Sequence, residues 1–316
     1  MKILITGGAG FIGSHLAEAL CHRGARVTVL DNLSLGKAAN LAWRTSGDDL
    51  EFIEGDFRDE KLLTQILPGC DCVFHEAAMP SVPRSVELPV ASNAHNLDGS
   101  LRLLVASRDA RVKRFLFASS SAIYGDVDVA AKHEGLPPNP LSPYALQKYA
   151  AEKYGQLFHQ LYGLETVGLR YFNVFGPRQA FDSPYSGVIA KFCSGMLRGE
   201  APTVFGDGLQ SRDFTYIDNV VSGNLLAAEA PAAQVAGKVF NLAGGQSISL
   251  LQLVADLNRL TGQNLPVNFA PPRAGDVRSS LADISAAQAA FGYAYKVAWP
   301  EGLRRTLDFY RAEAGK

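Results

Sequence analysis

The chain has 316 residues, of which 47% are hydrophobic and 19% are charged, so it is long enough to bury a large core in one or two domains. Its 30 lysines and arginines nearly balance its 31 aspartates and glutamates, which gives no electrostatic reason to expect a nucleic acid or a membrane surface as a partner. Its four cysteines are too few for a disulfide scaffold, its six histidines show no metal-binding spacing, and no apolar stretch approaches the roughly 18 residues of a membrane span. The composition predicts a globular, cytoplasmic protein without a metal.

Short apolar runs alternate with longer segments of helical period through the first half of the chain. The runs predicted as strands are Ile3–Ile5, Arg26–Leu30, Glu51–Ile53, Cys72–His75, Arg114–Ala118 and Thr166–Leu169. The helices predicted between them are Phe11–His22, Glu60–Leu67, Val90–Arg108 and Pro143–Leu161. Strands that are apolar throughout and alternate with helices are typical of a parallel sheet covered on both faces. The pattern therefore predicts an α/β fold with a doubly wound parallel sheet of the Rossmann type.

Near Gly176 this alternation of predicted strands and helices ends, and proline, glycine and polar residues become frequent. The helices predicted in this part are Gly187–Leu197, Ile217–Ala230, Leu250–Leu260 and Trp299–Tyr310, joined by irregular loops. We therefore expect a first domain over residues 1–175, with part of 203–242 returning to its sheet. Most of residues 176–316 should form a smaller, mixed C-terminal lobe.

A glycine-rich turn follows the first predicted strand and opens the first predicted helix. Its glycines at positions 7, 10 and 13 allow a tight turn, close approach of the backbone to a pyrophosphate, and close packing of helix on strand. Asp31 ends the second strand, where a carboxylate can bind the adenosine ribose and repel a 2′-phosphate. No arginine or lysine follows Asp31 before Lys37, which favours NAD over NADP. Asp56, after the third strand, could bind the adenine amino group.

Tyr144 and Lys148 lie four positions apart on a predicted helix, which puts both side chains on one face. A phenol with a pKa of about 10 is a poor base at neutral pH, but a neighbouring ammonium stabilises its phenolate. The same lysine could bind the nicotinamide ribose. A second pair with this spacing, Tyr149 and Lys153, lies five residues further on and so on a different face.

Serines distinguish the two pairs. Residues 119–121 are all serine and follow the strand Arg114–Ala118, at the edge of a parallel sheet where ligands bind. A serine hydroxyl there could relay a proton between a substrate and a tyrosine. The glycine turn, these serines before Tyr124-Gly125, and the sequence Pro143-Tyr144-x-x-x-Lys148 together resemble the extended short-chain dehydrogenase/reductase family.

The resemblance implies NAD as the cofactor, with Tyr144 as the base, Lys148 beside it and either Ser120 or Ser121 as the relay. It assigns residues 1–175 to NAD and most of residues 176–316 to the substrate. The cofactor contacts that it implies are Gly7, Gly10, Phe11, Ile12, Gly13, Asp31, Asn32, Asp56, Phe57, Ala77, Ala78, Asn96, Tyr144, Lys148 and Tyr171.

Within this family, blocks over nearly the whole chain are similar to UDP-hexose and UDP-N-acetylhexosamine 4-epimerases. These blocks are His75–Ser85, Arg170–Gln179, Tyr185–Ile189, Gly206–Phe214 and Arg273–Arg278. The likeness implies substrate contacts at Ser81, Asn173, Gly187, Val188, Phe205, Arg212, Arg273, Asp276 and Ser280. Arg212 and Arg273 would clamp the two phosphates, and Asp276 would bind the uridine ribose.

The same likeness bears on which sugar fits. Ser280 stands where hexose-restricted members carry a large tyrosine, Gly187 where others have asparagine, and Pro80 where strict hexose enzymes have lysine. Small side chains at 187 and 280 would leave room for a 2-N-acetyl group. The implied reaction removes the 4-hydroxyl proton and the C4 hydride, rotates the 4-keto sugar, and returns the hydride to the opposite face. The helices Val90–Arg108 and Tyr144–Leu161 resemble the pair through which this family forms homodimers.

The same scaffold hosts other reactions. A 4,6-dehydratase would need an Asp-Glu pair just before Tyr124, where this chain has Ser121-Ala122. A UDP-glucuronate decarboxylase or epimerase is a closer alternative, in which Arg178 or Arg84 would hold the sugar carboxylate. A non-catalytic NAD-binding module is the third possibility.

Overall fold

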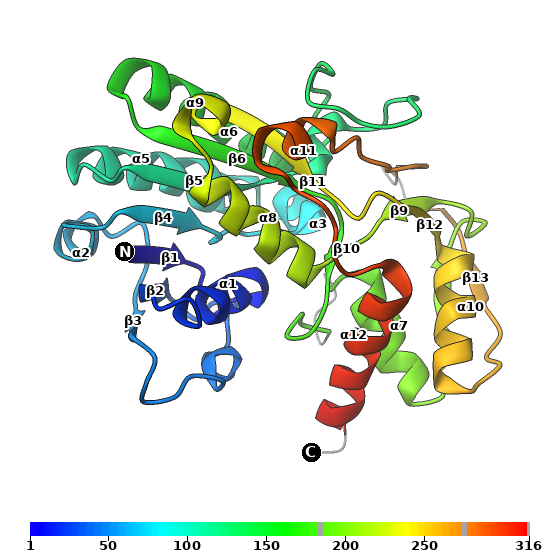
Figure 1. Ribbon diagram of the computed structural model, residues 1–316. Helices are drawn as coiled ribbons and strands as arrows, with labels where there is room; N and C mark the ends of the chain where they lie inside the picture. Colours follow the sequence, from blue (N-terminus) through cyan, green and yellow to red (C-terminus); the bar gives the residue numbers. More distant parts are fainter. Residues whose placement is uncertain (182–185, 273–276, 315–316) are drawn as a thin grey trace.

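A seven-stranded parallel sheet forms the centre of the molecule (Figure 1). The structure is a computed structural model and describes residues 1–181, 186–272 and 277–314. The strand order is β11-β6-β5-β4-β1-β2-β3. The strands are β1 (Lys2–Thr6), β2 (Arg26–Asp31), β3 (Leu50–Glu54), β4 (Cys72–His75), β5 (Arg114–Ser120), β6 (Glu165–Tyr171) and β11 (Lys238–Leu242). The order changes direction between β1 and β4, which opens a ligand crevice at their carboxyl ends and confirms the predicted Rossmann-type sheet.

Helices cover both faces of this sheet because its strands are apolar on both sides. Ile3 and Ile5 of β1 pack into the cluster that contains α1 (Phe11–Cys21) and α8 (Ile217–Glu229). Leu4, between them, packs into the opposite cluster. The helices of that opposite face are α2 (Glu60–Ile66), α5 (Gly99–Asp109) and α6 (Pro143–Tyr162). All three strand residues are at most 1% exposed, as expected for a central strand.

The segment Val90–Arg108, predicted as one helix, is interrupted. It consists of α4 (Pro89–Asn93), a π-helical turn (Ala94–Asp98) and α5, and the short α3 (Val82–Glu87) precedes it. The π-turn carries Asn96, whose side chain is 1% exposed and bonds the backbone of Met79. Single-turn π-helical insertions inside α-helices are frequently found at functional sites.

The C-terminal lobe lies to the lower right of the sheet in Figure 1. Its helices are α7 (Val188–Leu197), α10 (Leu250–Thr261) and α12 (Trp299–Ala314). Short strand pairs accompany them: β7 (Val174–Phe175) with β10 (Thr215–Tyr216), β8 (Thr203–Phe205) with β13 (Asn268–Ala270), and β9 (Ser211–Asp213) with β12 (Ser247–Ser249). The remaining short helices are η1 (Ala38–Leu41), η3 (Ser121–Tyr124), α9 (Ala232–Val235) and α11 (Ser285–Phe291). Strand β11, from the segment 203–242, pairs with β6 of the main sheet.

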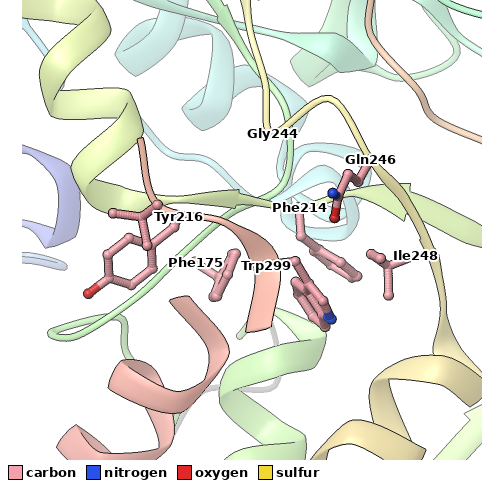
Figure 2. Close-up of a pocket in the computed structure, with 8 residues that line it drawn as sticks. Phe175, Phe214, Tyr216, Gly244, Gln246, Ile248 and Trp299 are labelled. Carbon is pink, nitrogen blue, oxygen red and sulfur yellow. The ribbon is translucent and has the colours of Figure 1, made fainter. Parts of the chain in front are cut away.

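An aromatic cluster packs α12 of this lobe against β7, the segment that follows β6 of the main sheet (Figure 2). Trp299 stacks on Phe214 with ring centroids 5.3 Å apart, and Phe175 packs against both rings at 5.4 and 6.2 Å. The Trp299 indole N–H donates to Asp256 Oδ2 at 2.8 Å, which ties α12 to α10. The small cavity beside these rings has a volume of about 10 Å³, which is room for one water molecule at most.

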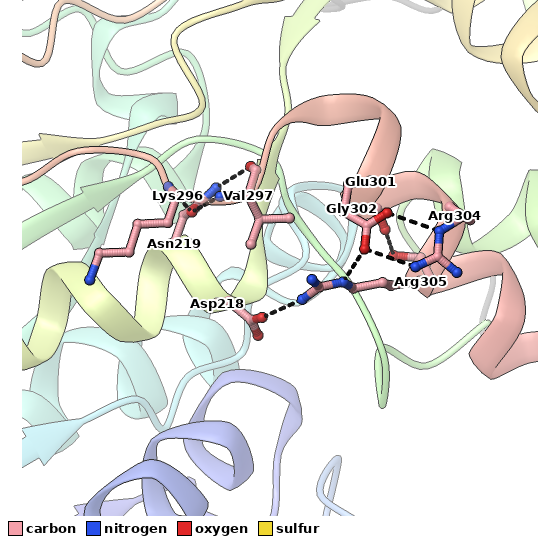
Figure 3. Close-up of polar contacts among 9 residues, drawn as sticks. Asp218, Asn219, Lys296, Val297, Glu301, Gly302, Arg304 and Arg305 are labelled. Carbon is pink, nitrogen blue, oxygen red and sulfur yellow. Dashed lines mark hydrogen bonds and ion pairs between the residues drawn. The ribbon is translucent and has the colours of Figure 1, made fainter.

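Polar contacts hold α12 against α8 (Figure 3). Asn219, 1% exposed, accepts from the backbone N–H groups of Lys296 and Val297 at 2.8 and 3.0 Å and donates to the Val297 carbonyl at 2.8 Å. Arg305 pairs with Asp218 and Glu301 at the surface. Because exposed ion pairs contribute little, Asn219 is the contact that fixes the start of α12.

Candidate active site

A large cleft of about 1350 Å³ runs over the carboxyl ends of the strands and into the C-terminal lobe. Its volume is sufficient for a dinucleotide together with a second nucleotide ligand. The predicted site residues that line it are Gly7, Gly10, Phe11, Ile12, Gly13, Asp31, Asn32, Phe57, Ala77, Ala78, Ser81, Ser120, Ser121, Tyr144, Lys148, Tyr171, Asn173, Gly187, Val188, Phe205, Arg212 and Ser280. Asp56 and Asn96 do not line it, and Arg273 and Asp276 lie outside the described residues.

The glycine turn forms one end of this cleft. A Cβ atom on Gly13 would lie 2.3 Å from the Gly7 carbonyl oxygen, and Gly7 has φ of +72°. Only glycine therefore fits both positions. Gly10 precedes α1 with no side-chain cap, so the first amide N–H groups of the helix stay available to an anionic ligand.

Asp31 is held rigidly at the edge of the cleft. Its Oδ2 accepts from the Ala9 N–H at 3.0 Å and its Oδ1 accepts from the Leu33 N–H at 2.8 Å. Burial raises the pKa of this carboxyl, and the two backbone bonds work against that shift. Each carboxylate oxygen keeps a further lone pair, with which it can accept from a ribose hydroxyl.

Asp56 and Asn96 have other partners. Asp56 forms a two-bond ion pair with Arg58 at 2.6 and 2.9 Å, which lowers the pKa of its carboxyl to about 2. Asn96 accepts from the Met79 N–H at 2.8 Å and donates to the Met79 carbonyl and to Gln147. From outside the cleft, Asn96 therefore stabilises the segment after β4, which contains Ala77 and Ala78.

Tyr144 and Lys148 lie in the first turns of α6 and face the cleft together. Helix α6 starts where Ser142 caps the Ala145 N–H and Pro143 occupies the first position. The Lys148 ammonium donates to the Ala118 carbonyl at 2.9 Å and lies 5.9 Å from the centre of the Tyr144 ring. Tyr149 and Lys153, the alternative pair, do not line the cleft.

The ionisation of these two groups differs in one respect from the sequence-based expectation. Burial raises the pKa of Tyr144, and a side-chain hydrogen bond with Ser120 opposes the rise. Burial lowers the pKa of Lys148 to about 8, while the charges of Glu76 and Glu152 act against this. We expected the lysine to lower the phenol's pKa, but removing the phenol from water dominates, so Tyr144 is protonated in this arrangement.

The far end of the cleft collects the predicted substrate residues from several loops. Arg212, on β9, donates to the carbonyls of Ser211 and Val277 at 2.8 and 2.6 Å. Asn173, with φ of +33°, donates to the Asp213 carbonyl at 3.4 Å. Ser280 is 5% exposed and lines the same end.

Comparison with known proteins identifies the fold family. The model of the NAD dependent epimerase/dehydratase family matches residues 3–243, most of the chain. The chain belongs to this family. The UDP-glucose 4-epimerase of Thermotoga maritima, solved with UDP-glucose, is 42% identical and matches with a TM-score of 0.94 over 99% of this chain and 100% of that one.

Two further epimerases of this family are similar over almost their full lengths. The UDP-N-acetylglucosamine 4-epimerase of Methanobrevibacter ruminantium, solved with UDP-N-acetylmuramic acid, is 40% identical with a TM-score of 0.94, covering 99% of this chain and 98% of that one. The UDP-glucose 4-epimerase of Thermus thermophilus, solved with NAD, is 38% identical with a TM-score of 0.89, covering 98% of this chain and 99% of that one. The resemblance inferred from the motifs is confirmed.

NAD is the cofactor of this epimerase/dehydratase family, as the sequence predicts. The residues present fit it, because the Gly7–Gly13 turn leaves space that a Cβ atom would fill and Asp31 stands where it can accept hydrogen bonds from a ribose. In the described part of the chain, no group of three His, Cys, Asp or Glu residues could hold a metal ion. Among the described residues, no helix is both long and apolar enough to cross a membrane.

Glu76 and Lys132 are among the charged residues of the cleft that the sequence reasoning missed. Glu76 follows β4 directly and Lys132 lies in the loop after η3; both line the cleft. The position of Glu76 at the carboxyl end of a central strand was a usable signal. No sequence signal indicates Lys132, because it lies in an irregular loop. Its burial comes from its pairing with Ala282, which is far along the chain.

Proposed function

We propose that this chain is an NAD-dependent UDP-sugar 4-epimerase, which inverts C4 of a UDP-hexose or UDP-N-acetylhexosamine through a transient 4-keto sugar. The observation that carries the proposal is the grouping of Tyr144, Ser120 and Lys148 in the cleft that the glycine turn enters. The names of the similar enzymes point the same way. The residues before Tyr124 are Ser121-Ala122, which lack the acid and base that sugar dehydration needs.

Tyr144 takes the proton of the sugar 4-hydroxyl, with Ser120 as the relay. NAD⁺, when bound, would supply the hydride chemistry at C4 of the sugar. Because burial raises the pKa of Tyr144, the proton can leave only if positive charge stabilises the phenolate, and the Lys148 ammonium stands beside the ring to supply it. We assign the relay to Ser120 since its hydroxyl is the one bonded to Tyr144.

The substrate lobe would hold the nucleotide while the sugar turns. Arg212 is suited to the pyrophosphate because its guanidinium stays charged and offers planar pairs of donors. The sugar end is bordered by small groups: Gly187, where a Cβ atom would meet nothing closer than Gln179 at 3.2 Å, and Ser280. We infer from this space that UDP-N-acetylglucosamine and UDP-N-acetylgalactosamine are accepted alongside UDP-glucose and UDP-galactose.

A second candidate, a UDP-glucuronate decarboxylase or 4-epimerase, is favoured by Lys132. Its side chain is 3% exposed, and its ammonium donates to the Gly125 carbonyl at 2.9 Å. In the described part of the chain no carboxylate lies within ion-pair distance of it. Burial lowers the pKa of Lys132, the charge of Asp126 acts against this shift, and the charge of Arg212 lowers the pKa further. A buried cation without a paired anion would be stabilised by a carboxylate on the sugar. Arg178, considered for this role, is paired with Glu18 at 2.5 Å.

The helix pair α5–α6 suggests how the enzyme assembles. We propose a homodimer through the outer face of α6, where Leu146, Leu157 and Leu161 are 56%, 45% and 66% exposed. An apolar stripe of this kind on a long surface helix is typical of an interface rather than of a solvated face.

The deciding experiment supplies the purified protein with UDP-glucose, UDP-N-acetylglucosamine and UDP-glucuronate separately and identifies the products by chromatography and NMR. We expect the C4 epimers of the first two, without net NADH formation. Tyr144→Phe should lower the rate at least about 100-fold. Turnover of UDP-glucuronate alone would favour the second candidate, and no turnover of any UDP-sugar would refute both.

A further inference from the structure

Glu76 occupies the floor of the catalytic cleft, directly after β4. Its Oε1 accepts a hydrogen bond from the Tyr171 hydroxyl at 2.8 Å. The Tyr171 hydroxyl oxygen in turn accepts from Asn224 Nδ2 at 2.9 Å, so the chain Asn224–Tyr171–Glu76 fixes one carboxyl oxygen. The other oxygen, Oε2, is buried and has no hydrogen-bond partner among the described residues. In a protein interior, a carboxylate that is held by only one hydrogen bond also interacts with more distant groups through its charge.

The groups around Glu76 come from three elements. Helix α6 contributes Tyr144 and Lys148, strand β6 contributes Tyr171, and helix α8 contributes the neutral Asn224. His75, its chain neighbour, bonds Thr6 and Ser100 in the opposite direction, and burial lowers the pKa of this imidazole to about 3, so it is neutral. Glu152, the other carboxylate near Lys148, forms a two-bond ion pair with Arg170, and its charge still raises the pKa of Lys148.

The charge of Glu76 therefore acts on Tyr144, and it acts on Lys148 together with the charge of Glu152. Burial raises the pKa of Glu76 to about 7, against the opposing effects of the Tyr171 bond and of Lys148. Once ionised, Glu76 raises the pKa of Tyr144 and also raises that of Lys148. The first effect disfavours the phenolate, and the second keeps the ammonium charged although burial works against it.

We propose that Glu76 is a positioning residue for the Tyr144–Lys148 pair, whose negative charge sets the pH range in which the phenol can lose its proton while the lysine keeps its own. This inference rests on the proposed function for its catalytic consequence. Glu76 acts on Tyr144 and Lys148 through space and holds Tyr171 through a hydrogen bond. The charge and the hydrogen bond are separable by substitution.

The test crosses two conservative variants of the NAD-loaded enzyme. Glu76→Gln keeps an oxygen that can accept from Tyr171 but removes the charge, and Glu76→Asp keeps the charge but is too short to keep the bond. We expect both limbs of the pH profile of kcat/KM to move to lower pH in Glu76→Gln, by roughly half a unit to one unit. In Glu76→Asp the limbs should stay near their wild-type positions even if kcat falls.

A direct titration provides the second readout. The near-ultraviolet absorbance of tyrosinate, taken as the difference between each enzyme and its Tyr144→Phe counterpart, reports the ionisation of Tyr144 without any substrate. We expect this titration to move to lower pH in Glu76→Gln. If the tyrosinate titration and both limbs of the pH profile stay in place in Glu76→Gln, the charge of Glu76 does not set the pH range of the catalytic pair. The same holds if Glu76→Asp shows the shift expected of Glu76→Gln. If wild-type protein epimerised no sugar, the titration would still decide the role of Glu76 separately from the proposed function.

Discussion

Ser120 and Ser121 are neighbours at the end of β5, and both line the cleft, but their surroundings differ. Ser120 Oγ accepts from the Ala122 N–H at 3.1 Å and is hydrogen bonded to Tyr144. Ser121 begins the 3₁₀ turn η3. A hydroxyl fixed by a backbone donor on one side can pass a proton to the phenol on the other without reorienting its oxygen.

We therefore expect Ser120→Ala to reduce kcat for UDP-sugar epimerisation by roughly 100-fold, since proton transfer loses its relay. Ser121→Ala is the matched control, because it removes the same hydroxyl one position away, and it should cost less than about tenfold. Steady-state kinetics with one UDP-sugar would measure both, with KM nearly unchanged in each. A larger loss in Ser121→Ala would reverse the assignment.

Residue roles that depend on packing were the hardest to predict from the sequence. Tyr144 and Lys148 were found because their spacing and the neighbouring serines form a pattern. Lys132 is a single charged residue in an irregular loop, and nothing in the residue types beside it indicates that the folded chain turns it into the cleft. Glu76 has only its position directly after β4 as a signal. The pKa of Tyr144 was expected to fall, because the sequence indicates the neighbouring lysine but not how completely the ring is buried.

At the scale of elements, the sequence predicted the central strands well. The predicted strand Cys72–His75 is β4 itself, and β1 and β2 extend the predicted ranges by at most one residue at an end. Buried parallel strands are apolar throughout, which is a strong signal. By contrast β9, whose sequence is Ser211-Arg212-Asp213, has no apolar pattern and forms only because β12 lies beside it. Such pairs are set by the tertiary fold.

The π-helical turn before α5 was also unpredictable, and it carries a testable role. Asn96→Ala would leave the buried N–H and carbonyl of Met79, and the Gln147 side chain, without this partner. We expect a loss of about 2–4 kcal/mol in the free energy of unfolding and weaker NAD binding, because the segment containing Ala77 and Ala78 loses its support. Urea denaturation and NAD titration would measure the two effects.

Asn93→Ala is the control for this prediction, since Asn93 lies one turn earlier, is half-buried, and makes no side-chain hydrogen bond among the described residues. It should change the unfolding free energy by less than about 1 kcal/mol. Equal losses in both variants would mean that the helix, rather than the Asn96 bonds, supports the loop.

At the scale of the whole molecule, the exposed leucines of α6 are opposite the cleft side of that helix. Tyr144 and Lys148 face inward, and Leu146 and Leu157 face outward from the same element, so an interface on α6 would also stiffen the helix that carries the catalytic pair. Burying leucines of this exposure stabilises an interface by roughly 1–2 kcal/mol each. A charge placed among them would be desolvated without a partner.

We therefore expect light scattering to give the wild-type chain twice its monomer mass of 33.9 kDa, and Leu157→Glu to give the monomer mass. Leu209→Glu is the matched control, because Leu209 is 57% exposed in the substrate lobe, and its mass should stay that of the dimer. If assembly stiffens α6, the Leu157→Glu monomer should also lose kcat while its KM changes little. A wild-type chain that runs as a monomer at all concentrations would show that the α6 leucines face solvent, and the catalytic helix would then be held by its intramolecular contacts, among them those of Ser142, Lys148 and Glu152.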